Sequence, residues 1–238
     1  MIFLRRAAHV AVFTFVLIPI TVVLTISQAV AEPRKRSQAV AESRKRSQAV
    51  AEPRKRSQAV AAAVARRRLA QLKVAGPLSI RGYSRERFQS RLSANRKGRC
   101  STREIVLARD GRDVRRNAAC HPVKGLWYSP YDGKWLKNEK YVDVDHLVPL
   151  AYAWRSGAKR WSPAKRRAFA NDLVRPELLT VSHSANIAKG GKGPQSWRPQ
   201  RRAHWCRYAT SWITVKRHYG LFVTRKERVA LLNMLRTC

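Results

Sequence analysis

Three consecutive copies of one ten-residue unit occupy most of the first quarter of the chain. Ser27–Arg36 reads SQAVAEPRKR, residues 37–56 repeat this unit twice with one substitution, and a fourth copy decays after SQAVA. Each full unit carries three basic residues and one glutamate, and its largest apolar side chain is valine. Such a unit cannot bury enough apolar surface to offset the chain entropy lost on folding. We therefore expect a disordered basic arm over residues 32–73 and a folded domain over residues 74–238.

The arm has two interpretations. A ten-residue period matches no solenoid unit, which favours a linker without a partner of its own. The alternative is a tether that binds the phosphates of nucleic acid or the anionic polymers of a cell envelope.

The extreme N-terminus resembles a secretory signal. Arg5 and Arg6 precede an apolar stretch over residues 7–26, and Ala29-Val30-Ala31 then provides a small-x-small cleavage site. This order predicts a signal peptide over residues 1–31 and a secreted protein. The alternative is an uncleaved membrane anchor through residues 7–26, because the apolar run is close to the shortest that can span a bilayer.

Positive charge is unusually high throughout the chain. The formal net charge is +36, and residues 74–238 carry +24 of it with only eleven acidic residues. A hydrophobic content of 45% excludes a wholly disordered basic protein, because it is enough for a core. So large an excess of positive charge predicts a polyanionic partner, either nucleic acid or an anionic surface.

All four cysteines lie in the expected folded domain. They are Cys100, Cys120, Cys206 and Cys238, and an even number behind a secretory signal predicts two disulfides. Three pairings are open, and we expect the local one, in which each cysteine joins its neighbour in the sequence. The alternative is a zinc site using Cys120-His121 and His204-x-Cys206, but the close ligand spacing typical of zinc is missing.

The pattern of the folded domain predicts an α+β fold. Capping boxes at Ser101–Glu104 and Thr224–Glu227 predict helix starts. A turn is expected over residues 127–135, and Trp205, Tyr208, Trp212 and Val215 recur at helical spacing, which favours a core-facing stripe. Strands are expected at residues 141–144 and 178–181, and helices at residues 150–155, 163–170 and 184–189.

Two of the rare acidic residues, Asp143 and Asp145, stand directly before a histidine in Tyr141-Val-Asp-Val-Asp-His-Leu-Val-Pro-Leu150. A hard cation needs carboxylate oxygens, and a histidine titrates near neutrality and can take a proton from water. The segment therefore suits metal-assisted hydrolysis. By itself the pair is weak evidence, because most Asp-His dipeptides combine a helix cap with a surface histidine.

The second half of the pattern is more specific. Residues 178–193, LLTVSHSANIAKGGKG, follow the D-V-D-H-x-V-P-L block and contain N-x-x-K-G. Together they resemble the HNH (ββα-metal) endonucleases, and most closely a secreted actinobacterial group related to the C-terminal nuclease domain of the GmrSD type IV restriction enzyme. The resemblance extends from about Gly98 to Cys238, and it implies a ββα-metal core with additional helices.

The resemblance also implies roles for individual residues. His146 matches the general base, Asp145 matches the first metal ligand, and Asn186 matches the second, with Mg²⁺ as the expected ion. From the residues themselves, we expect Lys189 and Lys192 to neutralise phosphate charge.

This chain departs from the family pattern at one position. The middle asparagine, which orients the base, should precede the second strand, but Arg175-Pro176-Glu177 stands there. Asn171, in F-A-N-D-L, is the nearest candidate. Asp143 and His183 are further candidates for supporting the site.

These observations predict a secreted, metal-dependent endonuclease that cleaves DNA, or RNA, with little sequence specificity. The alternative is a non-catalytic cationic protein, secreted or anchored, that binds nucleic acid or an anionic envelope. A toxin-like nuclease with an immunity or inhibitor protein is a third interpretation.

Overall fold

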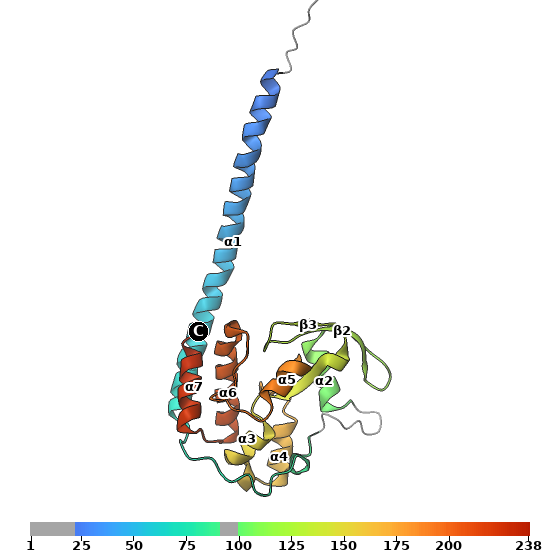
Figure 1. The fold of residues 1–238 in the computed structure, drawn as a ribbon, viewed down its shortest axis with the longest axis vertical. Helices are drawn as coiled ribbons and strands as arrows, with labels where there is room; N and C mark the ends of the chain where they lie inside the picture. The colour runs from blue at the N-terminus through green and yellow to red at the C-terminus, as the bar shows by residue number, and fades with distance from the viewer. Residues whose placement is uncertain (1–21, 91–99) are drawn as a thin grey trace, which may run out of the picture. The chain divides into compact units, whose positions relative to one another are not determined.

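The computed structural model describes residues 22–90 and 100–238 (Figure 1). The chain divides into two units, residues 1–53 and 54–238, which are described separately. The predicted signal peptide falls largely outside the described residues and stays a prediction. Among the helices that the structure describes, none is long and apolar enough to cross a membrane.

The repeats are helical, which differs from the disordered arm expected from the sequence. They lie in α1 (Val22–Ala70), and residues 35–49 of the first unit are exposed throughout. Alanine, glutamine, glutamate, lysine and arginine are strong helix formers, so this composition favours a helix without tertiary packing. The exposed ion pair between Glu42 and Arg46, one helical turn apart, adds a small contribution.

The last turns of α1 pack into the unit of residues 54–238, ahead of residue 74, where the sequence analysis placed the start of the folded domain. Ala62, Ala65 and Leu69 are buried in the main core, and the Arg66 guanidinium donates a 2.6 Å hydrogen bond to the carbonyl of Leu235. The decay of the fourth repeat explains the difference. It replaces the Glu-Pro-Arg-Lys of the unit with Ala62-Ala-Val-Ala65, and Ala62, Ala65 and the following Leu69 form an apolar stripe at helical spacing.

A short helix and a small sheet come next. Ser101 and Glu104 form the expected capping box at the start of α2 (Thr102–Asp110). Three antiparallel strands then follow, β1 (Arg112–Arg116), β2 (Pro122–Tyr128) and β3 (Trp135–Leu136), in the order β1-β2-β3. The sequence analysis expected the turn between β2 and β3 but not β1, whose charged residues do not alternate with apolar ones.

A second, two-stranded sheet holds the acidic segment. β4 (Val142–His146) pairs with β5 (Leu178–Ser182) in antiparallel register, with Asp143 opposite Val181 and Asp145 opposite Leu179. The connection carries α3 (Leu150–Arg155) and α4 (Pro163–Ala170), and α5 (His183–Lys189) begins directly after β5.

The chain ends in two helices, α6 (Trp205–Tyr219) and α7 (Arg225–Leu235). The predicted aromatic stripe is buried, because Tyr208, Trp212 and Val215 of α6 lie in the main core. The second capping box, at Thr224 and Glu227, opens α7 as expected. Short 3₁₀ turns complete the fold, at Glu86–Phe88, Glu139–Tyr141, Ala158–Arg160 and Arg202–His204.

Two apolar clusters position the second sheet. The main core combines residues of α3, α4, α6, α7 and the end of α1, and it also takes Leu147 and Val148 from the segment after β4. A smaller cluster places Val142 and Val144 against Val106, Leu107 and Trp127 of α2 and β2. Because side chains alternate along a strand, burying these valines turns Asp143 and Asp145 to the opposite face.

Candidate active site

α5 lies against the acidic face of β4. Ser182 caps the helix by accepting a hydrogen bond from the Ala185 amide, so the chain turns directly from β5 into α5. This tight turn brings the helix back over its own hairpin, and both aspartates of β4 contact α5 side chains. Two strands and a helix thus place residues from distant parts of the sequence together, and the site is built on this unit.

Asp145 occupies the buried end of this face and is only 6% exposed. The Lys189 ammonium lies 2.9 Å and 2.8 Å from its two carboxylate oxygens and also 2.9 Å from the carbonyl of His146. The Tyr131 hydroxyl donates a 2.7 Å hydrogen bond to the same carboxylate. Burial raises the pKa of the Asp145 carboxyl, and the Lys189 ammonium opposes this rise.

Asp143 occupies the more open end of the face. The Asn186 amide donates a 2.8 Å hydrogen bond to Asp143 Oδ2, and His183 Nδ1 lies 2.9 Å from the same oxygen. All three side chains reach solvent in part. The structure therefore brings together five residues that the sequence singled out: Asp143, Asp145, His183, Asn186 and Lys189.

His146 is the last residue of β4, directly after Asp145. It is 4% exposed, and its Nε2 lies 2.9 Å from the carbonyl oxygen of Ala170. A carbonyl only accepts hydrogen bonds, so Nε2 carries the proton and Nδ1 keeps the lone pair. Burial lowers the pKa of His146 to about 3, so the imidazole is neutral near pH 7.

Asn171 is the candidate for the residue that orients the base. It follows Ala170, whose backbone carbonyl contacts the His146 ring. Its amide donates hydrogen bonds to the carbonyls of Gln89 and Arg167, and its oxygen accepts one from the Thr102 hydroxyl. These bonds fix the end of α4. The contact to His146 comes from the preceding residue, Ala170.

Glu177 stands where the middle asparagine was expected, and the sequence analysis assigned it no role. It is completely buried, its Oε2 accepts a 3.1 Å hydrogen bond from the Val148 amide, and its carbonyl accepts one from the Leu147 amide. Burial raises the pKa of Glu177 well above its usual value. Glu177 therefore holds the backbone just after His146. Its place directly before β5 was the signal that could have identified it.

Lys189 and Lys192 lie in very different places. Lys189 is fully buried and paired with Asp145, and its expected role on a phosphate stays a prediction. The amphipathic lysine side chain extends inward because a buried carboxylate needs a partner. Lys192 is exposed beyond the end of α5, and its ammonium contacts the carbonyl of Ala188.

The chain matches a model of the C-terminal domain of GmrSD restriction endonucleases over residues 107–234, which is more than half its length and includes every site residue above. The chain belongs to this family. A protein of Arthroderma benhamiae, named "Uncharacterized secreted protein", is 44% identical over 177 residues, covering 74% of this chain and 86% of that protein. No solved structure matches the chain.

Membership of the GmrSD restriction endonuclease family makes the chain a nuclease-like hydrolase, and its substrate is nucleic acid. The predicted resemblance is thereby confirmed at the level of the family. The actinobacterial type named in the sequence analysis stays a prediction.

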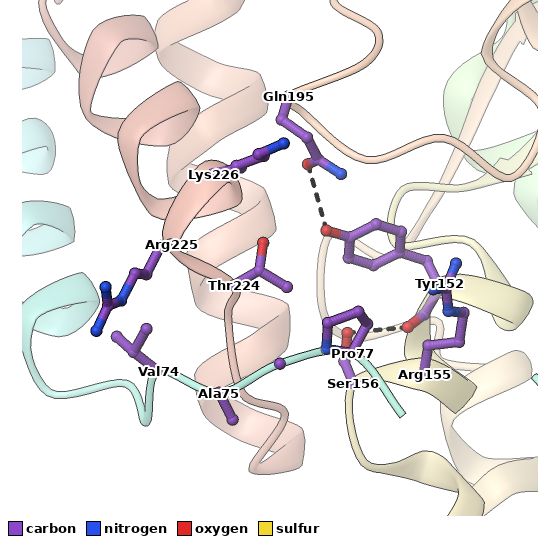
Figure 2. A pocket seen from close by; sticks show the side chains of 11 residues that line it. Val74, Ala75, Pro77, Tyr152, Arg155, Ser156, Gln195, Thr224, Arg225 and Lys226 are labelled. Atoms are coloured by element: carbon purple, nitrogen blue, oxygen red, sulfur yellow. Dashed lines mark hydrogen bonds between the residues drawn. The ribbon is translucent and has the colours of Figure 1, made fainter. Parts of the chain in front are cut away.

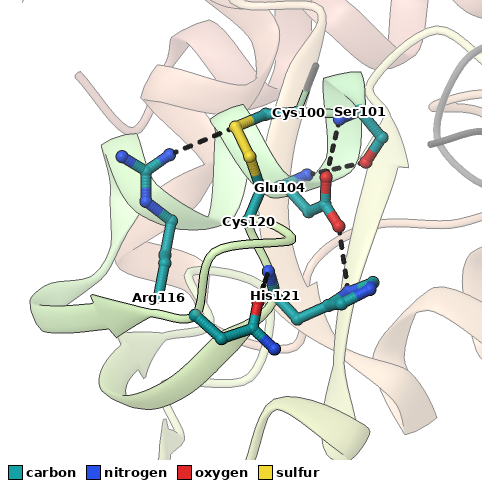
Figure 3. The surroundings of a disulfide bond; sticks show 7 residues. Cys100, Ser101, Glu104, Arg116, Cys120 and His121 are labelled. Atoms are coloured by element: carbon teal, nitrogen blue, oxygen red, sulfur yellow. Dashed lines mark hydrogen bonds and ion pairs between the residues drawn. A yellow bond between two sulfur atoms is a disulfide. The ribbon is translucent and has the colours of Figure 1, made fainter. Parts of the chain in front are cut away.

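The disulfides follow the expected local pairing. Cys100 joins Cys120, and Cys206 joins Cys238, so no cysteine is left for zinc. Beside the first bond, the buried Glu104 carboxylate accepts the Ser101 amide hydrogen bond and lies 2.9 Å from His121 Nδ1 (Figure 3). Both disulfides fit a protein that works outside the reducing cytosol.

A pocket of about 690 Å³ lies beside α3 and the start of α7 (Figure 2). The Tyr152 hydroxyl at its wall lies 3.0 Å from Glu227 Oε2 and 3.3 Å from Gln195 Oε1. Its lining combines aliphatic residues with three cationic ones, Arg155, Arg225 and Lys226. None of the site residues on β4 or α5 lines this pocket, so it is separate from the candidate active site.

Proposed function

We propose that this chain is a secreted, metal-dependent endonuclease of the HNH (ββα-metal) type that hydrolyses the phosphodiester bonds of DNA with little sequence specificity. One observation carries the proposal. In a chain of a nuclease family, two strands and a helix gather Asp143, Asp145 and Asn186 on one face, and a neutral, oriented His146 follows directly on the same strand.

The acidic face suits a divalent cation, most plausibly Mg²⁺. Carboxylate and amide oxygens are donors that Mg²⁺ accepts, and the Lys189 ammonium on both Asp145 oxygens indicates that this carboxylate is arranged for positive charge. In the part of the chain that the structure describes, no three His, Cys, Asp or Glu side chains gather as a metal site, so the amide of Asn186 is needed. Asp145 and Asn186 would hold the ion, with Asp143 beside them. A bound ion would polarise the phosphate and stabilise the leaving oxygen.

His146 would act as the general base through Nδ1. The carbonyl of Ala170 holds the proton on Nε2, so Nδ1 is the nitrogen that can accept a proton from the attacking water. Because burial keeps the ring neutral, the base is in its competent form at ordinary pH. Glu177 and Ala170 hold the backbone and the ring on either side.

The charge of the folded domain supports binding through the phosphate backbone. A net charge of +24 over residues 74–238 attracts any nucleic acid without reading its bases. Binding should weaken steeply with salt, because each neutralised phosphate releases counterions. The arginines and lysines of the repeats in α1 would add to this attraction.

Plasmid nicking by the purified chain tests the proposal. Wild type should relax supercoiled DNA with Mg²⁺ and not with EDTA, and His146→Ala should abolish nicking while still shifting the DNA in a gel. His218→Ala, at an exposed position on α6, is the matched control and should cut like wild type. RNA in a parallel reaction determines the substrate preference.

Two outcomes would reject this function. If His146→Ala or EDTA-treated protein cuts as fast as wild type, the mechanism is wrong. If wild type binds DNA but never cuts it with any divalent metal, the chain is the non-catalytic cationic protein considered above.

A further inference from the structure

An aromatic pair, one half-buried and one exposed, brackets the loop that contacts the candidate active site. Tyr128 ends β2 and Trp135 begins β3, and the two are paired across the hairpin. In the loop between them, the Tyr131 hydroxyl donates a hydrogen bond to Asp145, and Asp132 Oδ2 accepts a 2.7 Å hydrogen bond from the Ser182 hydroxyl. The pair is therefore tied through only a few residues to both β4 and the start of α5.

Two arginines extend this pair into a row, which we call the ribbon stack: Arg201, Tyr128, Trp135 and Arg112. The ring centroids of Tyr128 and Trp135 lie 5.0 Å apart. The Arg112 guanidinium lies 4.6 Å from the Trp135 ring centre, and that of Arg201 lies 5.6 Å from the Tyr128 ring centre. Arg201 lies in the segment before α6. Its backbone amide also donates a hydrogen bond to the carbonyl of Tyr131.

The ribbon stack is open to solvent. Trp135 is 48% exposed, although the chain buries three of its other tryptophans almost completely. The same small sheet carries further exposed basic residues, on β1, on β2, in the β2–β3 loop and directly after β3: Arg115, Arg116, Lys124, Lys134 and Lys137. Leaving a half-exposed tryptophan in water is unfavourable. A polymer with planar bases and anionic phosphates would match both the flat ring and the basic surface around it.

We propose that the ribbon stack binds single-stranded nucleic acid. Unpaired bases would stack on the tryptophan and the guanidinium planes, while the arginines and neighbouring lysines pair with the phosphates. A duplex keeps its base faces covered, so it can use the charges but not the exposed ring. This proposal deepens the proposed function, on which it rests, because it names single strands as the preferred substrate and the stack as the entrance to the site.

Binding to labelled oligonucleotides tests the stack without any cleavage. The His146→Ala chain, kept in EDTA, is titrated with a 12-nucleotide oligothymidine, with oligouridine of the same length, and with a 12-base-pair duplex. Trp135→Ala should weaken single-strand binding about 5- to 150-fold, the range expected for losing one stacked base, and change duplex binding less than about twofold.

Two further variants keep the test decisive. Tyr141→Ala removes another exposed aromatic residue outside the stack and should leave all three affinities unchanged. Trp135→Phe retains an aromatic face and should restore most single-strand binding, which separates stacking from a loss of folding.

The outcomes also separate this proposal from the nuclease function. The ribbon stack does not stack on bases if Trp135→Ala weakens single-strand and duplex binding equally. The same conclusion follows if the variant weakens neither, whatever the nicking assay shows. If single-strand binding depends on Trp135 but wild type never cuts, the stack is retained and the proposed function is rejected.

Discussion

His146 Nε2 lies 2.9 Å from the carbonyl oxygen of Ala170, and this one contact connects the end of β4 to the end of α4. The F-A-N-D-L segment thus has a defined physical task. Its backbone fixes the ring and its tautomer, and the side chain of Asn171 fixes that backbone. A histidine held in this way presents the same nitrogen to water in every molecule.

The tautomer of His146 is directly measurable. Nitrogen-15 NMR of the imidazole should show a neutral ring protonated on Nε2 at pH 5, well below the usual histidine pKa of about 6.5, because burial lowers its pKa to about 3. An unstructured histidine peptide in the same buffer should be mostly protonated. A doubly protonated His146 at pH 5 would contradict the buried geometry.

Lys189 should be important for stability. Lys189→Met leaves the buried Asp145 carboxylate without its cation, and breaking a buried pair on one side costs about 3–5 kcal/mol in free energy of unfolding. Urea denaturation measures this. Lys192→Met, the exposed control on the same segment, should change it by less than about 0.5 kcal/mol. Equal effects would show that the Asp145–Lys189 pair is not formed in solution.

The buried carboxyl of Glu177 should make the free energy of unfolding depend on pH. Because its pKa is raised in the folded protein, its contribution to stability is fully present below the ordinary glutamate pKa of about 4.3 and is lost as pH rises. Glu177→Gln keeps an acceptor for the Val148 amide but cannot ionise, so it should be more stable than wild type at pH 8 and equal to it near pH 4.

The alanine variant separates the two properties of this side chain. Glu177→Ala leaves the Val148 amide without its acceptor and should have about 1–3 kcal/mol less unfolding free energy than Glu177→Gln at every pH, because neither variant ionises at this position. A pH-independent difference between wild type and Glu177→Gln would mean that the carboxyl is not buried.

Local signals in the sequence predicted local structure well. The capping boxes at Ser101 and Thr224 and the buried stripe of α6 each follow from residues within a few positions of one another. The charged strand β1 was missed because its pairing with β2 gives it its conformation, and its own pattern does not. The helical repeats were missed because low complexity was read as disorder, although the residue types favour a helix.

The candidate site also combines residues that the sequence identified with contacts between distant segments that it did not. Spacing and resemblance singled out Asp143, Asp145, His146 and Asn186. Their neighbours could not be predicted, because Tyr131 and Ala170 contact them across the fold. Lys189 is buried because it pairs with the buried carboxylate of Asp145, and sequence spacing alone does not reveal this pair.

The end of α1 provides a last test, because it decides where the folded domain begins. Leu69 is 1% exposed in the main core, so Leu69→Ala should cost about 2–5 kcal/mol of unfolding free energy. Val60→Ala, on the exposed side of the same helix, should cost less than about 0.5 kcal/mol. A chain that starts at residue 54 should match the urea midpoint of the longer protein, whereas one that starts at residue 74 should unfold at lower urea or fail to fold. Equal midpoints for the two truncated chains would show that the last turns of α1 contribute nothing to the core.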